Sequence, residues 1–179
     1  GEDMAGKRFV VQGFGNVGAH FARLAHEGGA RVVAVSDVSG AVRDENGLDI
    51  PALIDHVAGQ GSVQGFAAEQ IGRDEVLFQP CDVLVPAALG SVITAENAGD
   101  VQARLVVEAA NAPVTPDAHE QLEERGVHVL PDILANAGGV TVSYFEWVQN
   151  IQQFRWSEDH VNSQLEQMMR RACGTVFDI

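Results

Sequence analysis

A glycine-rich stretch constrains the fold of this chain more than any other feature of its sequence. Residues 13–18, Gly-Phe-Gly-Asn-Val-Gly, have the spacing G-x-G-x-x-G. They lie between an apolar run at 8–12, which predicts a strand, and a stretch that predicts a helix. Gly13 permits a tight turn, Gly15 lets the backbone approach a pyrophosphate, and Gly18 allows close packing of helix on strand. Because a helix N-terminus offers N–H groups and a positive dipole end to an anion, the stretch predicts a dinucleotide-binding turn.

The acid that follows the second predicted strand indicates which dinucleotide is bound. Asp37 closes the strand expected at 31–36. A carboxylate at such a strand end can accept both hydroxyls of an adenosine ribose and would repel a 2′-phosphate, so NAD is the expected cofactor. Ser36, Ser39 and Arg43 would hold a 2′-phosphate if the loop turned them inward, so NADP stays an alternative.

The rest of the chain alternates short apolar runs with helical stretches. Further strands are expected at 83–85, 105–107 and 127–130, and helices from Ile50, from 116 to 126 behind a Thr115 cap, from 136 onward, and from 158 to about 169. Such alternation predicts an α/β fold, a doubly wound, mainly parallel, Rossmann-like sheet with a C-terminal helical segment. We place the dinucleotide-binding domain at 1–150 and the helical segment at 151–179, and the strand order stays open.

Two helix faces are predicted from the spacing of apolar residues. The helix after the glycines is expected to bury one face in the core, formed by Val17, Phe21, Leu24 and Ala25. The helix after 136 is expected to bury a face formed by Val140, Phe145, Val148 and Ile151.

Composition and charge exclude several functional classes. The formal net charge of -14 would repel nucleic acid and anionic lipid, so neither is expected as a partner. No apolar run approaches the ~20 residues of a membrane span, and no signal-peptide pattern opens the sequence. The 2 cysteines make no disulfide framework and the 6 histidines have no metal-ligand spacing. We therefore expect a cytoplasmic protein without a metal.

Four further stretches give the chain a family resemblance. They are 81–89 (CDVLVPAAL), 108–113 (EAANAP), 131–140 (PDILANAGGV) and 143–147 (SYFEW). Together with residues 12–18 they resemble the C-terminal domain of the glutamate/leucine/phenylalanine/valine dehydrogenases, over nearly the whole chain. The run at 138–147 is similar to the glutamate branch in particular.

The resemblance implies a set of cofactor-binding residues. They are Gly13, Phe14, Gly15, Asn16, Val17, Gly18, Asp37, Ala87, Asn111 and Asn136. Asn16 and Val17 would meet the phosphates, and Ala87 and Asn111 the nicotinamide ribose. Asn136 would orient the nicotinamide carboxamide, because an amide side chain can both donate and accept. The alternative for each asparagine is a turn or cap residue.

The resemblance also implies part of a substrate site. Val140 would pack against the substrate side chain, and Ser143 would hydrogen-bond a substrate carboxylate. The two residues stand at i and i+3, so one helical face can present both to one cavity. The alternative for Ser143 is a helix serine bonded back to a backbone carbonyl.

The family's reaction is the reversible oxidative deamination of glutamate to 2-oxoglutarate and ammonia with NAD(P). Its acid–base lysine and aspartate belong to an N-terminal substrate domain that we expect this chain to lack. No catalytic residue is therefore assigned here, and the chain is expected to bind cofactor without turnover. The resemblance implies a homo-hexamer for the full-length enzyme. Two alternatives stay open: a leucine-, valine- or phenylalanine-type dehydrogenase, and a non-catalytic nucleotide-binding module.

Overall fold

The computed structural model describes residues 4–177 and divides into two compact units, Gly1–Leu130 and Pro131–Ile179. The first unit contains every strand of the described chain, and the second is helical. The domain boundary expected at 150 falls inside helix α5 (Ala137–Gln152). A continuous helix offers no break for a boundary, whereas Pro131 ends strand β7 (His128–Leu130) and starts a new element.

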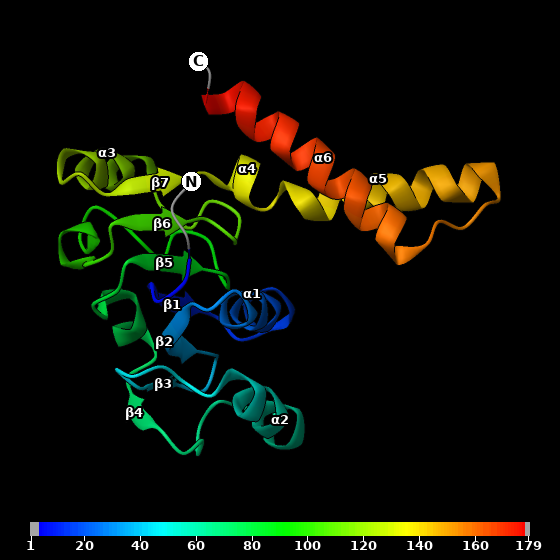
Figure 1. The fold of residues 1–179 in the computed structure, drawn as a ribbon. Coiled ribbons are helices and arrows are strands. Elements are labelled where there is room, and N and C mark those ends of the chain that lie inside the picture. Colours follow the sequence, from blue (N-terminus) through cyan, green and yellow to red (C-terminus); the bar gives the residue numbers. More distant parts are fainter. Residues whose placement is uncertain (1–3, 178–179) are drawn as a thin grey trace. The chain divides into compact units, whose positions relative to one another are not determined.

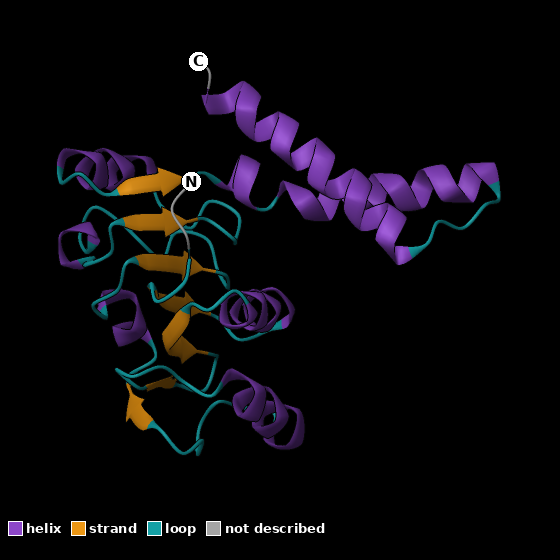
Figure 2. Cartoon of the chain, viewed as in Figure 1, coloured by secondary structure: helices purple, strands orange, loops and turns teal. Residues whose placement is uncertain are grey.

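The first unit is built on a 7-stranded sheet in the order β4-β3-β2-β1-β5-β6-β7 (Figure 1, Figure 2). Its parallel part is formed by β1 (Arg8–Gln12), β2 (Arg31–Ser36), β5 (Val83–Pro86), β6 (Leu105–Val107) and β7. The order reverses at β1, which pairs with β2 on one side and β5 on the other. In such sheets the ligand crevice lies at the carboxyl ends of the strands beside this switch point.

Two short strands extend the sheet beyond β2 and were not expected from the sequence. Strand β3 (Ala41–Arg43) runs antiparallel to β2, and β4 (Glu69–Ile71) runs antiparallel to β3. The expectation of a mainly parallel, doubly wound sheet is confirmed, with this antiparallel edge as an addition.

Helices cover both faces of the sheet (Figure 1). Helix α1 (Asn16–Glu27) and helix α2 (Ile50–Gln60) lie on one face, over a core that includes Val11, Val35 and Val85. The other face carries α3 (Pro116–Glu124) and the short 3₁₀ helices η1 (Asp74–Phe78) and η2 (Ala98–Asp100). The expected cap of α3 is present, since the Thr115 side chain accepts a hydrogen bond from the Ala118 N–H.

The buried face of α1 matches the predicted one only in part, since Ala25 is buried and Phe21 is half-buried as predicted. Gly18, Ala22 and Ala25 are buried, whereas the side chains of Val17 and Leu24 are 55% and 54% exposed. Small residues let the helix axis come close to the sheet, and larger side chains on that face would hold it away. The glycine motif, not apolar spacing, decides which face of this helix is turned inward.

The second unit consists of α4 (Asp132–Ala135), α5 and α6 (Glu158–Phe177). Phe145 is the buried residue of α5, and its ring lies 5.6 Å from the ring of Trp156. Val148 is half-buried as predicted, but Val140 and Ile151 are 71% and 63% exposed, so only part of the predicted face is buried. Helices α5 and α6 make up most of this unit, and two helices can bury only the stripe along which they meet.

Candidate functional site

The glycine turn between β1 and α1 is shaped by close contacts that exclude side chains. Gly13 has a φ of +98°, a conformation that favours glycine, and a Cβ placed on it would lie 2.7 Å from the Cβ of Ala88. A Cβ on Gly18 would lie 1.8 Å from the carbonyl oxygen of Gly13. The first and third glycines of the motif are therefore required by the fold itself.

The middle glycine has no such structural requirement. Gly15 has a φ of -81°, which any residue can adopt, and a Cβ built on it meets no atom within 4 Å. Nothing in the described chain explains a glycine here, whereas a ligand lying against the backbone would. This observation fits a phosphate group bound over the turn.

The N-terminus of α1 is open in the same place. Gly15 is its N-cap residue, no side chain caps the helix, and its first turn contains no acid. The first N–H groups of a helix have no intrahelical partner, so they and the positive dipole end are available to an anion. Asn16 and Val17 begin this helix and are exposed, while Gly18 is buried against β1.

Ser36 fastens the glycine turn to the end of β2. Its side chain is 2% exposed, and its Oγ accepts a hydrogen bond from the Gly13 N–H at 3.3 Å. The turn and the acid that follows Ser36 are thereby held at the same edge of the sheet.

Asp37 organises the loop around it. Its Oδ1 accepts hydrogen bonds from the N–H and hydroxyl of Ser39 and from the Gly40 N–H, and its Oδ2 accepts one from the Val63 N–H at 2.7 Å. Burial alone would raise the pKa of Asp37, but these hydrogen bonds outweigh burial and hold the pKa below its ordinary value. Since a carboxylate offers about four acceptor positions, Oδ2 retains capacity for one further donor.

The loops after β5 and β6 complete this edge of the sheet. Ala87 donates its N–H to the Gln12 carbonyl at 2.7 Å, which ties the end of β5 to the end of β1. Ser91 and Ala112 both have positive φ, 53° and 43°, and the Ser91 N–H donates to the Ala112 carbonyl at 2.8 Å. Non-glycine residues in this conformation cost about 1–3 kcal/mol each and cluster at functional sites. Asn111, exposed, immediately precedes Ala112 in this strained loop.

One cleft of about 590 Å³ lies at the glycine turn and at the ends of β2 and β5, and Asn111 is not among the residues that line it. It is lined by Gly13, Phe14, Gly15, Asp37 and Ala87 among the residues assigned to the cofactor from sequence. Its volume lies in the range of small-molecule and cofactor sites, ~300–1,000 Å³. Sequence reasoning missed other lining residues, among them Arg73, Asp74 and Val92. No local motif marks them, because they reach the cleft only through the sheet topology.

The remaining predicted residues belong to the second unit. Asn136 directly precedes α5 as its N-cap residue but caps it with no side-chain hydrogen bond. Val140 and Ser143 lie on α5 with exposed side chains, and the Ser143 hydroxyl donates to the Gly139 carbonyl at 3.2 Å. The back-bonded serine is thus the arrangement present in this structure, and the hydroxyl is accessible from solvent.

Within residues 4–177, no group of three or more His, Cys, Asp or Glu side chains is arranged to hold a metal ion. In the same range, no helix has both the length and the apolar character needed to cross a membrane.

Comparisons with known proteins give a consistent family. The family model for glutamate/leucine/phenylalanine/valine dehydrogenase matches residues 1–179. The chain is 48% identical over 174 residues to the NAD-specific glutamate dehydrogenase of Staphylococcus aureus (strain COL), covering 97% of this chain and 42% of that protein.

Solved structures match in the same way. The hetero-hexameric glutamate dehydrogenase of Thermus thermophilus, in its leucine-bound form, superposes with a TM-score of 0.88 at 37% identity, over 96% of this chain and 40% of that one. The glutamate dehydrogenase of Peptoniphilus asaccharolyticus gives a TM-score of 0.78 at 37% identity, with the same coverage. The chain therefore spans about two fifths of the length of these relatives.

Proposed function

Because the chain belongs to the glutamate/leucine/phenylalanine/valine dehydrogenase family, we propose that it is the dinucleotide-binding part of a glutamate dehydrogenase. The proposed reaction is the reversible oxidative deamination of L-glutamate to 2-oxoglutarate and ammonia. The cofactor, when bound, accepts the hydride that leaves the α-carbon of the amino acid. The open glycine at position 15, in a turn whose other two glycines the fold requires, is the observation that carries the proposal.

The role of the glycine turn is to bind the pyrophosphate. The N–H groups at the start of α1 would donate to phosphate oxygens, and Gly15 would leave room for the phosphates against the backbone. The absence of an acid in the first turn of α1 keeps the potential there positive. Phe14 anchors the turn, since its side chain is 5% exposed and packs in the core between α1 and the sheet.

NAD is the proposed cofactor, and Asp37 supports this choice. A carboxylate whose pKa is lowered stays ionised at neutral pH, so it accepts a ribose hydroxyl and repels a phosphate. The relative from Staphylococcus aureus is described as NAD-specific. Ala87, Asn111 and Asn136 are proposed for the nicotinamide end.

The substrate contacts are proposed on α5. The exposed Val140 and Ser143 share one face, and the Ser143 hydroxyl would exchange its bond to the Gly139 carbonyl for a substrate carboxylate. A hydroxyl suits the polar end of glutamate better than the side chain of leucine, valine or phenylalanine, which favours the glutamate branch over those alternatives.

Titration of the purified chain with NADH, and separately with NADPH, tests the proposal. Binding is monitored by nicotinamide fluorescence. We expect saturable binding of NADH, with NADPH binding either more weakly or not at all. Tighter NADPH binding would change the cofactor assignment only. Absence of binding of either at millimolar concentration would contradict the proposed function.

The assembly and location of the enzyme complete the proposal. We propose an oligomeric enzyme in the cytoplasm, and the relative from Thermus thermophilus, which is described as hetero-hexameric, supports six subunits. That the six subunits are identical is proposed from the family resemblance alone. Light scattering of the enzyme in its full-length form checks the assembly: a mass of six subunits supports it, and a monomer contradicts it.

A further inference from the structure

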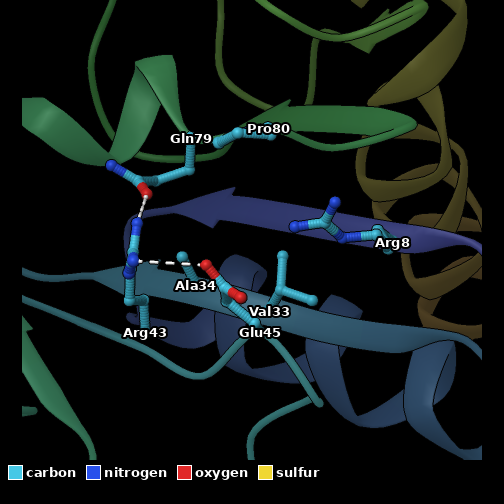
Figure 3. A pocket seen from close by; sticks show the side chains of 7 residues that line it. All are labelled: Arg8, Val33, Ala34, Arg43, Glu45, Gln79 and Pro80. Carbon is cyan, nitrogen blue, oxygen red and sulfur yellow. Dashed lines mark hydrogen bonds and ion pairs between the residues drawn. The ribbon is translucent and has the colours of Figure 1, made fainter.

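Arg43, which the sequence offered as a partner for a 2′-phosphate, is turned to other partners. Its Nε donates to Glu69 at 2.7 Å. Its two terminal nitrogens donate to Gln79 and Glu45 at 2.8 Å and 3.4 Å (Figure 3). It lines a separate small cavity with Arg8, Val33, Ala34 and Pro80, and is not among the residues that line the cleft at the glycine turn. All three nitrogens of its guanidinium are therefore engaged, and none is directed to the cofactor cleft.

Arg73 is the cation that lines the cleft instead. Across the sheet edge, Ser36 at the end of β2 pairs with Ala41 of β3, which pairs with Ile71 of β4. Since neighbouring strands lie about 4.8 Å apart, this ladder brings the turn after Ile71 to the same edge as Ser36 and Asp37. Arg73 lies in that turn and lines the cleft together with Asp37 and Val38.

Asp74 holds Arg73 in an ion pair at the same place. The Arg73 Nε donates to the Asp74 Oδ1 at 3.0 Å, and both side chains are exposed, at 56% and 81%. The cleft thus carries two carboxylates, Asp37 and Asp74, against one guanidinium. The excess of negative charge on this side of the cleft would repel a 2′-phosphate, whereas it would not repel a neutral ribose hydroxyl.

We propose that the Arg73–Asp74 pair sets the choice between NAD and NADP in this chain, because Asp74 withholds the Arg73 guanidinium from a 2′-phosphate. The proposal rests on the proposed dinucleotide-binding function and adds two specificity-determining residues to it. Removing the Asp74 charge leaves Arg73 free to pair with the phosphate, which carries about two negative charges.

Binding titrations of the purified chain with NADH and NADPH test this. We expect Asp74→Asn to tighten NADPH binding about five- to tenfold, the effect of one guanidinium charge released from its ion pair several ångströms from a phosphate in water, and to leave NADH binding within about twofold. Arg73→Gln should not show the gain, and the double variant with Asp74→Asn should lose most of it. Glu27→Gln is the matched control, because Glu27 is an exposed carboxylate paired with Arg23 at 2.8 Å and does not line the cleft.

The outcomes separate this proposal from the function on which it rests. If Asp74→Asn changes the NADPH to NADH affinity ratio no more than Glu27→Gln does, while NADH still binds, the pair does not set the preference. A gain that persists undiminished in the double variant also overturns the proposal, because it would not need Arg73. If the wild-type chain and all variants bind neither dinucleotide, the proposed function fails and this proposal falls with it.

Discussion

The third glycine of the turn, Gly18, is packed directly on the first, Gly13. A Cβ atom on Gly18 would stand 1.8 Å from the Gly13 carbonyl oxygen and 3.3 Å from a methyl group of Val11. The first turn of α1 therefore lies against the backbone of its own entry loop, and this contact aims the helix N-terminus at the cleft. Gly15, three residues before Gly18, has open space in place of such a contact. The motif combines two glycines that the fold needs with one that a ligand would need.

We expect Gly18→Ala to destabilise the chain by about 2–3 kcal/mol, because α1 must move off the turn to make room for a methyl group. Chemical denaturation measures the change. Gly59→Ala is the matched control: Gly59 lies inside α2, where an added methyl group would meet no atom within 4 Å, and its substitution should be neutral or stabilising by up to about 1 kcal/mol. Equal effects of the two substitutions would argue against the close contact.

We expect Asp37→Asn to cost about 1 kcal/mol at pH 7, discounted for solvent screening, since an amide replaces charge-assisted hydrogen bonds to the loop. The pKa of Asp37 is lowered by folding, so its contribution is present above the ordinary value of 3.8 and is lost as pH falls through the lower folded pKa. The free energies of unfolding of wild type and variant should therefore begin to converge below about pH 4. A difference in the free energy of unfolding that stays constant from pH 7 to pH 3 would contradict this. Asp55→Asn, on the exposed face of α2, is the control, and an equal pH-dependent loss of stability in that variant would also contradict it.

Cys81 should resist alkylation in the folded chain. Burial of the thiol and then repulsion from Asp82 raise its pKa to about 12, against a smaller opposite effect of Arg8. Because only the thiolate reacts, we expect iodoacetamide at pH 8 to label Cys81 at least about a hundredfold more slowly than in the denatured chain. Mass spectrometry of the labelled peptides gives the two rates, and comparable rates would contradict the burial of this residue.

Ser143→Ala should change stability by less than about 0.5 kcal/mol. The side chain is exposed, and its hydroxyl donates one hydrogen bond to the Gly139 carbonyl in the same helix. Thermal unfolding of the variant checks this. A loss above about 1 kcal/mol would mean that the fold itself requires the hydroxyl, and would weaken its proposed role toward a substrate.

The elements that the sequence predicted well have strong local signals. The strands at 8–12, 31–36 and 105–107 are confirmed, as are the Thr115 cap and the helix that follows the glycine turn. Each of these strands contains two adjacent valines, the helix is marked by the glycine motif before it, and the Thr115 side chain bonds the backbone of its own helix. The last helix runs on to Phe177, beyond the expected end near 169, because no glycine or proline stops it before Gly174.

The features that sequence reasoning missed depend on pairing between distant segments. Strands β3 and β4, with the sequences Ala-Val-Arg and Glu-Gln-Ile, contain no adjacent β-branched residues that would mark a strand, and they form because each adds to an existing sheet edge. Arg73 enters the cleft only through that added edge, and Arg43, closer to Asp37 in sequence, is drawn away by Glu69. The exposure of Val17 and Leu24 has a different, local origin, since the contact of Gly18 with Gly13 and Val11 sets the rotation of α1.

Binding of a dinucleotide pyrophosphate over the glycine turn can be measured by calorimetric titration of NADH into the wild-type chain and into Gly15→Ala. We expect binding to the wild type and at least about tenfold weaker binding to the variant, because the added methyl group occupies the space that the phosphates need. The variant should also lose less than about 1 kcal/mol of stability, the cost of alanine at a helix N-cap. Equal NADH affinity in the two proteins would show that no phosphate lies over Gly15, and the proposed role of the turn would be wrong.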